Sequence, residues 1–229
     1  MPPTPTAKPA FLFDLDGTLI DSVYEHVLAW REALREMQIE LSTWRIHRRV
    51  GMSDGLMVTA LQRETGRKLT KEETERLKRL HSEAFLKRVA QVRPLPGARE
   101  LLSTLSRLSV PWAIATSGVE ERAREAVKIL DVGPEVQLIT RNDVAHGKPF
   151  PDLFLAGAKR LKVDINDCIV VGDSIWDLLA ARRARALGVG LLCGGYGQDE
   201  LVQAGAYRVY EDPVELTRHI DELGVQADL

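Results

Sequence analysis

The chain has 229 residues, a length that suits one ordinary domain or a core with a smaller domain inserted into it. Hydrophobic residues make up 45% of it and charged residues 28%, which favours a packed soluble core and excludes a largely disordered chain. The formal net charge is -2, so neither nucleic acid nor an anionic membrane surface is expected as a partner.

The cysteines and the start of the chain favour the cytoplasm. Cys168 and Cys193 are far apart in no C-x-x-C pattern, and Cys168 lies in an apolar run, so we expect a core residue rather than a disulfide or zinc site. No apolar run approaches the roughly 20 residues that a membrane helix needs. Residues 1–9 are proline-rich without an apolar signal core, and we expect them to form a disordered tail.

The first third of the chain predicts one strand followed by helices. An apolar run at residues 10–15 is bounded by Pro9 and Gly17, as in a buried strand. Residues 22–37 have the helical period in their apolar positions. The sequence is then charged and helix-favouring up to Val92, and we expect three or four amphipathic helices. Thr70 precedes Glu73 by three residues, which predicts a capping box at one helix start.

After the turn-rich residues 93–97 the pattern changes to alternating strands and helices. We expect strands at residues 110–115, 136–139, 168–171, 188–192 and 207–210, and helices at residues 101–108, 120–130, 151–161, 175–186, 199–205 and 214–223. Such alternation predicts an α/β protein, in which helices cover both faces of a parallel sheet. The helical residues 22–92 are then an insertion into a core made of residues 1–21 and 93–229.

Ligands of an open parallel sheet bind at the carboxyl ends of its strands. Asp14 and Asp16 follow the first strand and flank one apolar residue, so both carboxylates point to the same side. Such a pair repels unless a cation lies between the two, and magnesium is a hard cation that suits carboxylate oxygens. The alternative is an ordinary turn with an Asx motif.

Two further clusters can bind an anion. Thr116, Ser117 and Gly118 follow the second long strand, where a hydroxyl and free N–H groups can hold phosphate, although such residues also serve as plain helix caps. Lys148 lies in a proline-rich turn, G-K-P-F-P-D, and can donate to phosphate or to carboxylates. The alternative for Lys148 is a surface lysine in a rigid turn.

The last cluster is acidic. Asp173 and Asp177 follow the strand at residues 168–171, and their spacing of four lets both face the strand ends if a helix begins between them. Capping of that helix is the alternative. Acids, a hydroxyl turn and a lysine at successive strand ends together have the composition needed to neutralise a magnesium-bound phosphoryl group.

The motifs DLDGT, TSG, GKPFPD and GDSIWD, in this order, resemble the haloacid dehalogenase superfamily in its phosphatase branch. The resemblance covers nearly the whole chain. The insertion looks like the cap of the subgroup that contains phosphoglycolate phosphatases and β-phosphoglucomutase. The resemblance implies a Rossmann-like core under a mobile cap, with hinges near residues 21–22 and 92–96, and a magnesium-dependent phosphatase of small phosphorylated metabolites. We expect a monomer or a small homo-oligomer.

The resemblance also implies four catalytic residues. Asp14 would be the nucleophile that forms an aspartyl-phosphate. Asp16 would be general acid for the leaving group and then general base for water. Thr116 would hydrogen-bond the transferring phosphoryl group, and Lys148 would hold Asp14 and the phosphate. A carboxylate attacks an anionic phosphate poorly because the charges repel, which explains the need for a cation and for Lys148.

Magnesium would bind the Asp14 carboxylate, the backbone carbonyl of Asp16 and Asp173, by the same resemblance. Asp177 would act through water or as an indirect contact. Backbone groups near Leu15, Ser117 and Gly118 would add phosphate contacts.

Other activities found in the superfamily are alternatives to phosphatase activity. Dehalogenases have an aromatic residue where this chain has Asp16, so dehalogenation is not expected. A sugar phosphomutase is the alternative, because the stretch around His26 resembles the mutase sequence. Val50 and Asp54 stand where that enzyme has basic residues for a second phosphate. A catalytically silent protein that binds phosphorylated metabolites is a further alternative.

In the cap, Arg49 is the best candidate for a substrate contact, with a solvent-exposed arginine as the alternative. His26 could hydrogen-bond the substrate or Asp16, or could pack as a polar residue under the cap hinge. These residues point to no named metabolite, so the substrate stays open and phosphoglycolate is a family-level expectation.

Overall fold

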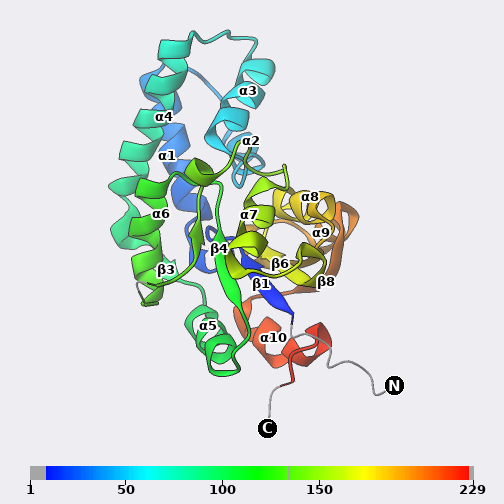
Figure 1. Cartoon of the computed structure of the whole chain (residues 1–229). Helices are drawn as coiled ribbons and strands as arrows, with labels where there is room; N and C mark the ends of the chain where they lie inside the picture. The colour runs from blue at the N-terminus through cyan, green and yellow to red at the C-terminus, as the bar shows by residue number, and fades with distance from the viewer. Residues whose placement is uncertain (1–8, 134, 227–229) are drawn as a thin grey trace.

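The computed structural model describes residues 9–133 and 135–226, and a parallel sheet of six strands lies at its centre (Figure 1). The strands are β1 (Ala10–Phe13), β4 (Trp112–Ala115), β5 (Leu138–Ile139), β6 (Cys168–Gly172), β7 (Leu187–Leu191) and β8 (Ala206–Tyr210). They are arranged in the order β5-β4-β1-β6-β7-β8. The predicted α/β class with a Rossmann-like parallel sheet is therefore confirmed.

Helices cover both faces of this sheet. They are α5 (Ala98–Arg107), α6 (Glu120–Val127), α7 (Asp152–Leu161), α8 (Ile175–Ala184), α9 (Gln198–Ala204) and α10 (Pro213–Arg218). Phe11 and Phe13 belong to a buried cluster with α5 and α10, whereas Leu12 belongs to a cluster with α7 and α8. Side chains alternate along a strand, so β1 presents apolar residues to both layers and is buried throughout.

The order of the strands places a crevice beside β1. From β1 the chain adds β4 and β5 on one side, then crosses back to build β6, β7 and β8 on the other side. In an open parallel sheet, ligands bind where the direction of strand addition reverses, in the crevice outside the carboxyl ends of the strands. The turns that follow β1, β4 and β6 all lie at this edge.

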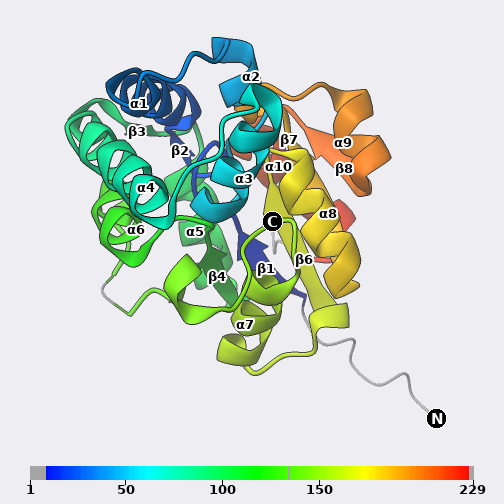
Figure 2. The same ribbon diagram turned by 90° about the horizontal axis from the view of Figure 1, so that it is seen from above.

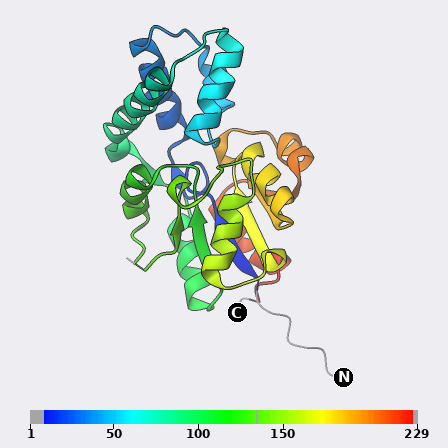
Figure 3. The same cartoon turned by 45° about the horizontal axis from the view of Figure 1, so that its top comes forward.

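The cap segment, residues 22–92, contains four helices in the described chain: α1 (Val23–Glu36), α2 (Thr43–His47), α3 (Asp54–Thr65) and α4 (Lys71–Leu86). It lies beyond the sheet at the top of Figure 3, and Figure 2 shows α1 and α4 side by side. The segment has its own buried cluster, which includes Trp30, Ile46, Met57 and Leu77. The predicted capping box is present, because Thr70 and Glu73 exchange hydrogen bonds at the start of α4.

Where the cap segment joins the core, two short strands pair in antiparallel fashion. They are β2 (Ile20–Asp21) and β3 (Arg93–Pro94), and they coincide with the two expected hinges. The sequence analysis did not predict them, since two residues are too few to show an alternating pattern.

Several predicted boundaries are wrong by a few residues. The strand predicted at residues 10–15 ends at Phe13, because the acidic turn begins at Asp14. The helix predicted at residues 101–108 begins at Ala98, after Gly97 with a φ of 76°. The helices predicted at residues 120–130 and 214–223 each end early and continue as the 3-10 turns Lys128–Leu130 and Ile220–Leu223.

Cys168 is buried in the core as predicted, and both cysteines are free thiols. The expected N-terminal tail falls on residues 1–8, which lie outside the described residues, and on Pro9. None of the helices in the described part of the chain combines the length and apolar character needed to cross a membrane.

Candidate active site

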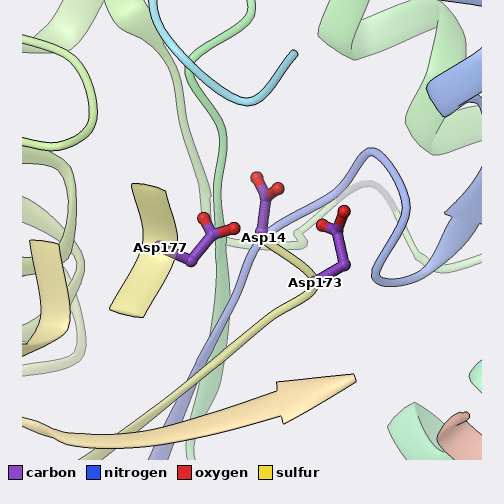
Figure 4. Close-up of side chains that lie close together, drawn as sticks. All are labelled: Asp14, Asp173 and Asp177. Carbon is purple, nitrogen blue, oxygen red and sulfur yellow. The ribbon is translucent and has the colours of Figure 1, made fainter. Parts of the chain in front are cut away.

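Three buried carboxylates meet at the carboxyl ends of β1 and β6. Asp14 follows β1, Asp173 follows β6, and Asp177 lies in the first turn of α8, as Figure 4 shows. Each offers a carboxylate oxygen, and these oxygens lie within 4.8 Å of one another. Asp14 of the first acidic cluster in the sequence therefore joins both acids of the second cluster in space.

Lys148 is the cation inside this cluster. Its side chain is fully buried, and its ammonium group forms ion pairs with Asp14 and, at 2.7 Å, with Oδ1 of Asp177. Burial alone would lower the pKa of Lys148, but the two carboxylates raise it above its usual range, so the side chain stays charged. Lys148 is thus a buried partner of both acids and not a surface residue.

The cluster carries more negative charge than Lys148 can balance. Burial is the main cause that raises the pKa of Asp14 to about 7; Lys148 opposes it, whereas Asp177 and Asp16 add to it. Burial, together with the nearby Asp177 and Asp14, raises the pKa of Asp173 well above its usual range. Oxygen donors with surplus negative charge suit a hard divalent cation such as magnesium.

The two oxygens of Asp177 already have partners. Oδ1 faces Lys148, and Oδ2 accepts hydrogen bonds from the backbone N–H and the hydroxyl of Ser174, which forms a capping box on α8. Asp14 and Asp173 are therefore the better candidates for direct metal ligands, and Asp177 holds the lysine. Thr18, which the sequence analysis did not single out although it ends the DLDGT motif, donates to Oδ1 of Asp173 at 3.0 Å.

Two glycines let the backbone approach these acids. A Cβ on Gly172 would collide with the Asp177 side chain, and a Cβ on Gly194 would collide with that of Asp173. Gly172 directly precedes Asp173 at the end of β6, and Gly194 lies in the turn after β7. No pattern around Gly194 reveals this role in the sequence.

The Asp16 carboxylate is not part of the cluster and faces the cap segment. Oδ1 of Asp16 accepts a hydrogen bond from Ser22 at 2.6 Å and lies 3.2 Å from Nε2 of His26. Burial by itself would raise the pKa of Asp16, but His26 and the hydrogen bond from Ser22 lower it to about 2. The side chain is therefore ionised near neutral pH in this arrangement.

The hydroxyl turn after β4 lies beside the acids. Thr116 Oγ1 accepts a hydrogen bond from the Gly118 N–H at 3.0 Å, and Ser117 Oγ accepts one from the Lys148 N–H at 3.3 Å. The turn is thus tied to the loop that carries Lys148. Leu15, between the two acids of the first motif, is fully buried and fixes the turn after β1.

A cavity of about 40 Å³ lies between the strand ends and the cap segment. Asp14, Asp16 and residues 116–118 line its core side. At the ~15 Å³ that one buried water needs, it has room for about three waters. A phosphorylated substrate is larger than this space.

The sequence profile of the haloacid dehalogenase-like hydrolases matches residues 8–185. The chain belongs to this family. It is 37% identical to hexitol phosphatase A of Escherichia coli over 169 residues, which are 72% of this chain and 74% of the relative. It is 28% identical to β-phosphoglucomutase of Bacillus subtilis over 217 residues, 91% of each chain. The crystal structure of a hydrolase from Pseudomonas syringae superposes with a TM-score of 0.92 and 53% identity over 94% of this chain and 99% of that one.

On the cap side of the cavity of this hydrolase, two histidines contact each other, and each stacks on an aromatic ring. His26 Nδ1 lies 3.2 Å from Nε2 of His81, the His26 ring stacks on Phe85, and the His81 ring stacks on Trp30. Burial, with the nearby Arg122 and His26, lowers the pKa of His81 well below its usual range. His26 therefore lies within hydrogen-bonding distance of Asp16 and packs against Phe85, whereas its contact with a substrate stays a prediction.

Two arginines also line the cavity, and both are paired. Arg49, the cap candidate of the sequence analysis, forms an ion pair with Glu64. Arg122 on α6 is buried and donates to both oxygens of Asp54, at 3.0 and 3.3 Å. The sequence analysis missed Arg122, because nothing in its neighbourhood distinguishes it from the other charged residues of that helix.

Proposed function

We propose that this protein is a magnesium-dependent phosphatase that hydrolyses a small phosphorylated metabolite through an aspartyl-phosphate on Asp14. The observation that carries the proposal is the buried cluster of Asp14, Asp173 and Asp177 around Lys148, open to a cavity at the strand ends. Membership of the haloacid dehalogenase-like hydrolases and the similarity to hexitol phosphatase A support it.

Asp14 is the proposed nucleophile. One of its carboxylate oxygens forms a bond to phosphorus while the bond between phosphorus and the leaving alcohol oxygen breaks. Lys148 neutralises part of the charge that opposes this attack, and Asp177 holds the ammonium group in place. Magnesium, bound by Asp14, Asp173 and the backbone carbonyl of Asp16, would supply the remaining positive charge.

Asp16 is the proposed acid and base. It gives a proton to the departing alkoxide, and afterwards it takes one from the water that attacks the aspartyl-phosphate and releases inorganic phosphate. Asp16 has to be protonated for the first of these steps. A phosphoryl group bound next to it adds negative charge, which raises its pKa from the low value set by His26.

The hydroxyl turn is the proposed phosphate cradle. Thr116 and the backbone N–H groups of Leu15, Ser117 and Gly118 would donate hydrogen bonds to the phosphoryl oxygens. The cap segment, residues 22–92, would move against the core formed by residues up to 21 and from 93 onward, with the β2–β3 ribbon as its hinge.

A sugar phosphomutase is the second candidate, and the similarity to β-phosphoglucomutase over 91% of the chain favours it. A mutase has to hold a second phosphate on its substrate. Val50 offers no charge for this, and Asp54 is an acid that already pairs with Arg122. We therefore favour hydrolysis.

The test measures inorganic phosphate released from p-nitrophenyl phosphate and from a panel of phosphorylated metabolites. We expect turnover with magnesium, none after treatment with a chelator, and recovery when magnesium is restored. No release from any compound would support a silent binding protein. Interconversion of hexose phosphates that needs a bisphosphate activator would support the mutase.

The proposal also covers the oligomeric state and the cellular location of the protein. We expect a cytoplasmic monomer or small homo-oligomer, which size-exclusion chromatography with light scattering and cell fractionation would check.

A further inference from the structure

The cap side of the cavity contains cations that are already neutralised. Among the described residues that line it, Arg49 of the cap segment and Arg122 of the core helix α6, which pairs with Asp54 of the cap segment, carry the positive charge. Arg49 pairs with Glu64, whose other oxygen lies 3.5 Å from Arg45, a residue outside the cavity lining. Arg122 pairs with Asp54, which itself lines the cavity. No guanidinium group of the lining is therefore left without a carboxylate partner.

The same side chains keep hydrogen-bond donors without partners. Within the described chain, Nε of Arg49 and Nε of Arg122 are buried donors that make no hydrogen bond, and Nδ1 of His81, a donor or an acceptor depending on its tautomer, has no hydrogen-bond partner either. Arg122 and His81 are almost completely buried, with exposed fractions of 4% and 1%. Unpaired buried donors are rare and costly, so a ligand that accepts hydrogen bonds would satisfy them. Because each guanidinium charge is balanced, a neutral oxygen is a suitable acceptor.

An anionic group of a substrate would be disfavoured on this surface. The Asp54 carboxylate lines the cavity and repels a second anion, and capture of that anion by Arg49 would require Glu64 to give up its partner. A carboxylate left buried and unpaired is strongly unfavourable. Hydroxyl groups can donate to Asp54 and accept from the free N–H groups, so they fit this surface.

Resting on the proposed function, we infer that the leaving group is a small uncharged polyol or sugar, and that Asp54 and Glu64 exclude substrates with a carboxylate or a second phosphate. The strand ends take the phosphoryl group, which leaves the cap side for the rest of the substrate. Asp54 and Glu64 are then specificity-determining residues.

A matched pair of substrates tests the inference. Glycerol 3-phosphate and 3-phosphoglycerate differ in a hydroxymethyl group against a carboxylate. With magnesium and the wild-type protein, we expect kcat/KM to be at least about tenfold higher for glycerol 3-phosphate, which corresponds to about 1.4 kcal/mol. Equal values, or a preference for 3-phosphoglycerate, would overturn the inference.

The variant Glu64→Gln removes the charge that neutralises Arg49. We expect it to raise kcat/KM for 3-phosphoglycerate about tenfold relative to glycerol 3-phosphate. Glu75→Gln is the matched control, because Glu75 pairs with Lys78 on the exposed side of α4 and should leave the ratio unchanged. An unchanged ratio in a folded Glu64→Gln protein contradicts the role of Glu64.

Asp54→Asn provides a second variant in case Glu64→Gln fails to fold. It leaves Arg122 without its counter-charge, and we expect the ratio to shift in the same direction. Hydrolysis of p-nitrophenyl phosphate separates the two proposals. Release from this compound but from neither glycerol 3-phosphate nor any other polyol phosphate rejects the inference alone, whereas no release from any compound also rejects the proposed function.

Discussion

The two ends of the cavity balance their charges in different ways. At the strand ends, Asp14, Asp173 and Asp177 share one lysine, which pairs with Asp14 and Asp177. Burial, together with the neighbouring acids, raises the pKa of Asp14 and of Asp173. On the cap side each arginine has its own carboxylate, and little charge remains unbalanced. The first end is incomplete without a cation and a phosphoryl group, whereas the second, among the described residues, is balanced in charge and lacks only hydrogen-bond acceptors for its buried N–H groups.

This difference indicates that the strand ends carry out the reaction and that the cap side selects the substrate. A surplus of buried charge is unfavourable for the fold and persists where a ligand compensates it, which is typical of a reaction centre. The paired charges on the cap side take no part in the reaction, but they determine which groups of a substrate can bind there. Variants at the strand ends should therefore affect turnover strongly, and variants of the cap side should affect stability and specificity.

The largest effect is expected for Asp14→Asn. The amide cannot form the aspartyl-phosphate, so kcat should fall by roughly 10,000-fold or more. The fold should persist, because the substitution removes one of the mutually repelling buried charges. Phosphate release measures the loss, and circular dichroism with thermal unfolding measures the fold. Activity near that of the wild type would reject the nucleophile.

Lys148→Met should reduce both activity and stability. It leaves Asp14 and Asp177 buried without a cation, which should lower the free energy of unfolding by about 3–5 kcal/mol. We expect kcat to fall by about 100- to 1,000-fold. Lys78→Met is the control, since Lys78 pairs with Glu75 at the surface and should cost at most about 1 kcal/mol. Equal losses in the two variants would contradict the comparison.

Gly172→Ala tests the packing behind the reaction centre. The added methyl group meets the Asp177 side chain, so it should push Asp177 away from Lys148. We expect a loss of about 1–3 kcal/mol in stability and about tenfold in kcat. Gly55→Ala on α3 has open space at the same atom and should stabilise by up to about 1 kcal/mol. A neutral effect of Gly172→Ala would show that Asp177 has room to move.

Much of the strand-end site was predictable from the sequence. Asp14, Thr116 and Asp173 each follow a strand-like run, and the carboxyl ends of parallel strands share one edge of a sheet. That rule brings residues together across more than 150 positions of chain. Lys148 was assigned to a strand end in the same way, although the strand before its loop, β5, has only two residues.

The cap side was not predictable in the same way. Arg122 and Asp54 are 68 positions apart, on helices that meet only after the cap segment has folded onto the core. Helical periodicity identifies the buried face of each helix but not which charged residues of two helices face each other. Arg49 and Glu64 are 15 positions apart within the cap segment, with Arg49 in the turn after α2 and Glu64 near the end of α3. The sequence could therefore name Arg49 as a candidate without revealing that its charge is balanced.

The smallest expected effect is the contribution of His81 to the pH dependence of the free energy of unfolding. His81 is buried with His26 on α1, Arg122 on α6 and, at 3.9 Å, Asp54 on α3 around it. Because its pKa lies well below the usual 6.5 in the folded protein, His81 gains a proton only on unfolding as the pH falls below 6.5. The unfolded state then binds more protons, so stability decreases with falling pH by up to about 1.4 kcal/mol per pH unit.

The variant His81→Asn removes this proton uptake. Chemical unfolding at pH 7.5, 6.5, 5.5 and 5.0 should show a shallower loss of stability in the variant, smaller by roughly 2 kcal/mol between pH 6.5 and 5.0. His219→Asn is the control, since His219 is exposed and far along the chain from the cavity, and it should leave the slope unchanged. The same slope in wild type and His81→Asn would mean that the stacked histidine pair takes up a proton without unfolding. The cap side of the cavity would then carry an unbalanced charge at acidic pH, and the contrast between its two ends would hold only near neutrality.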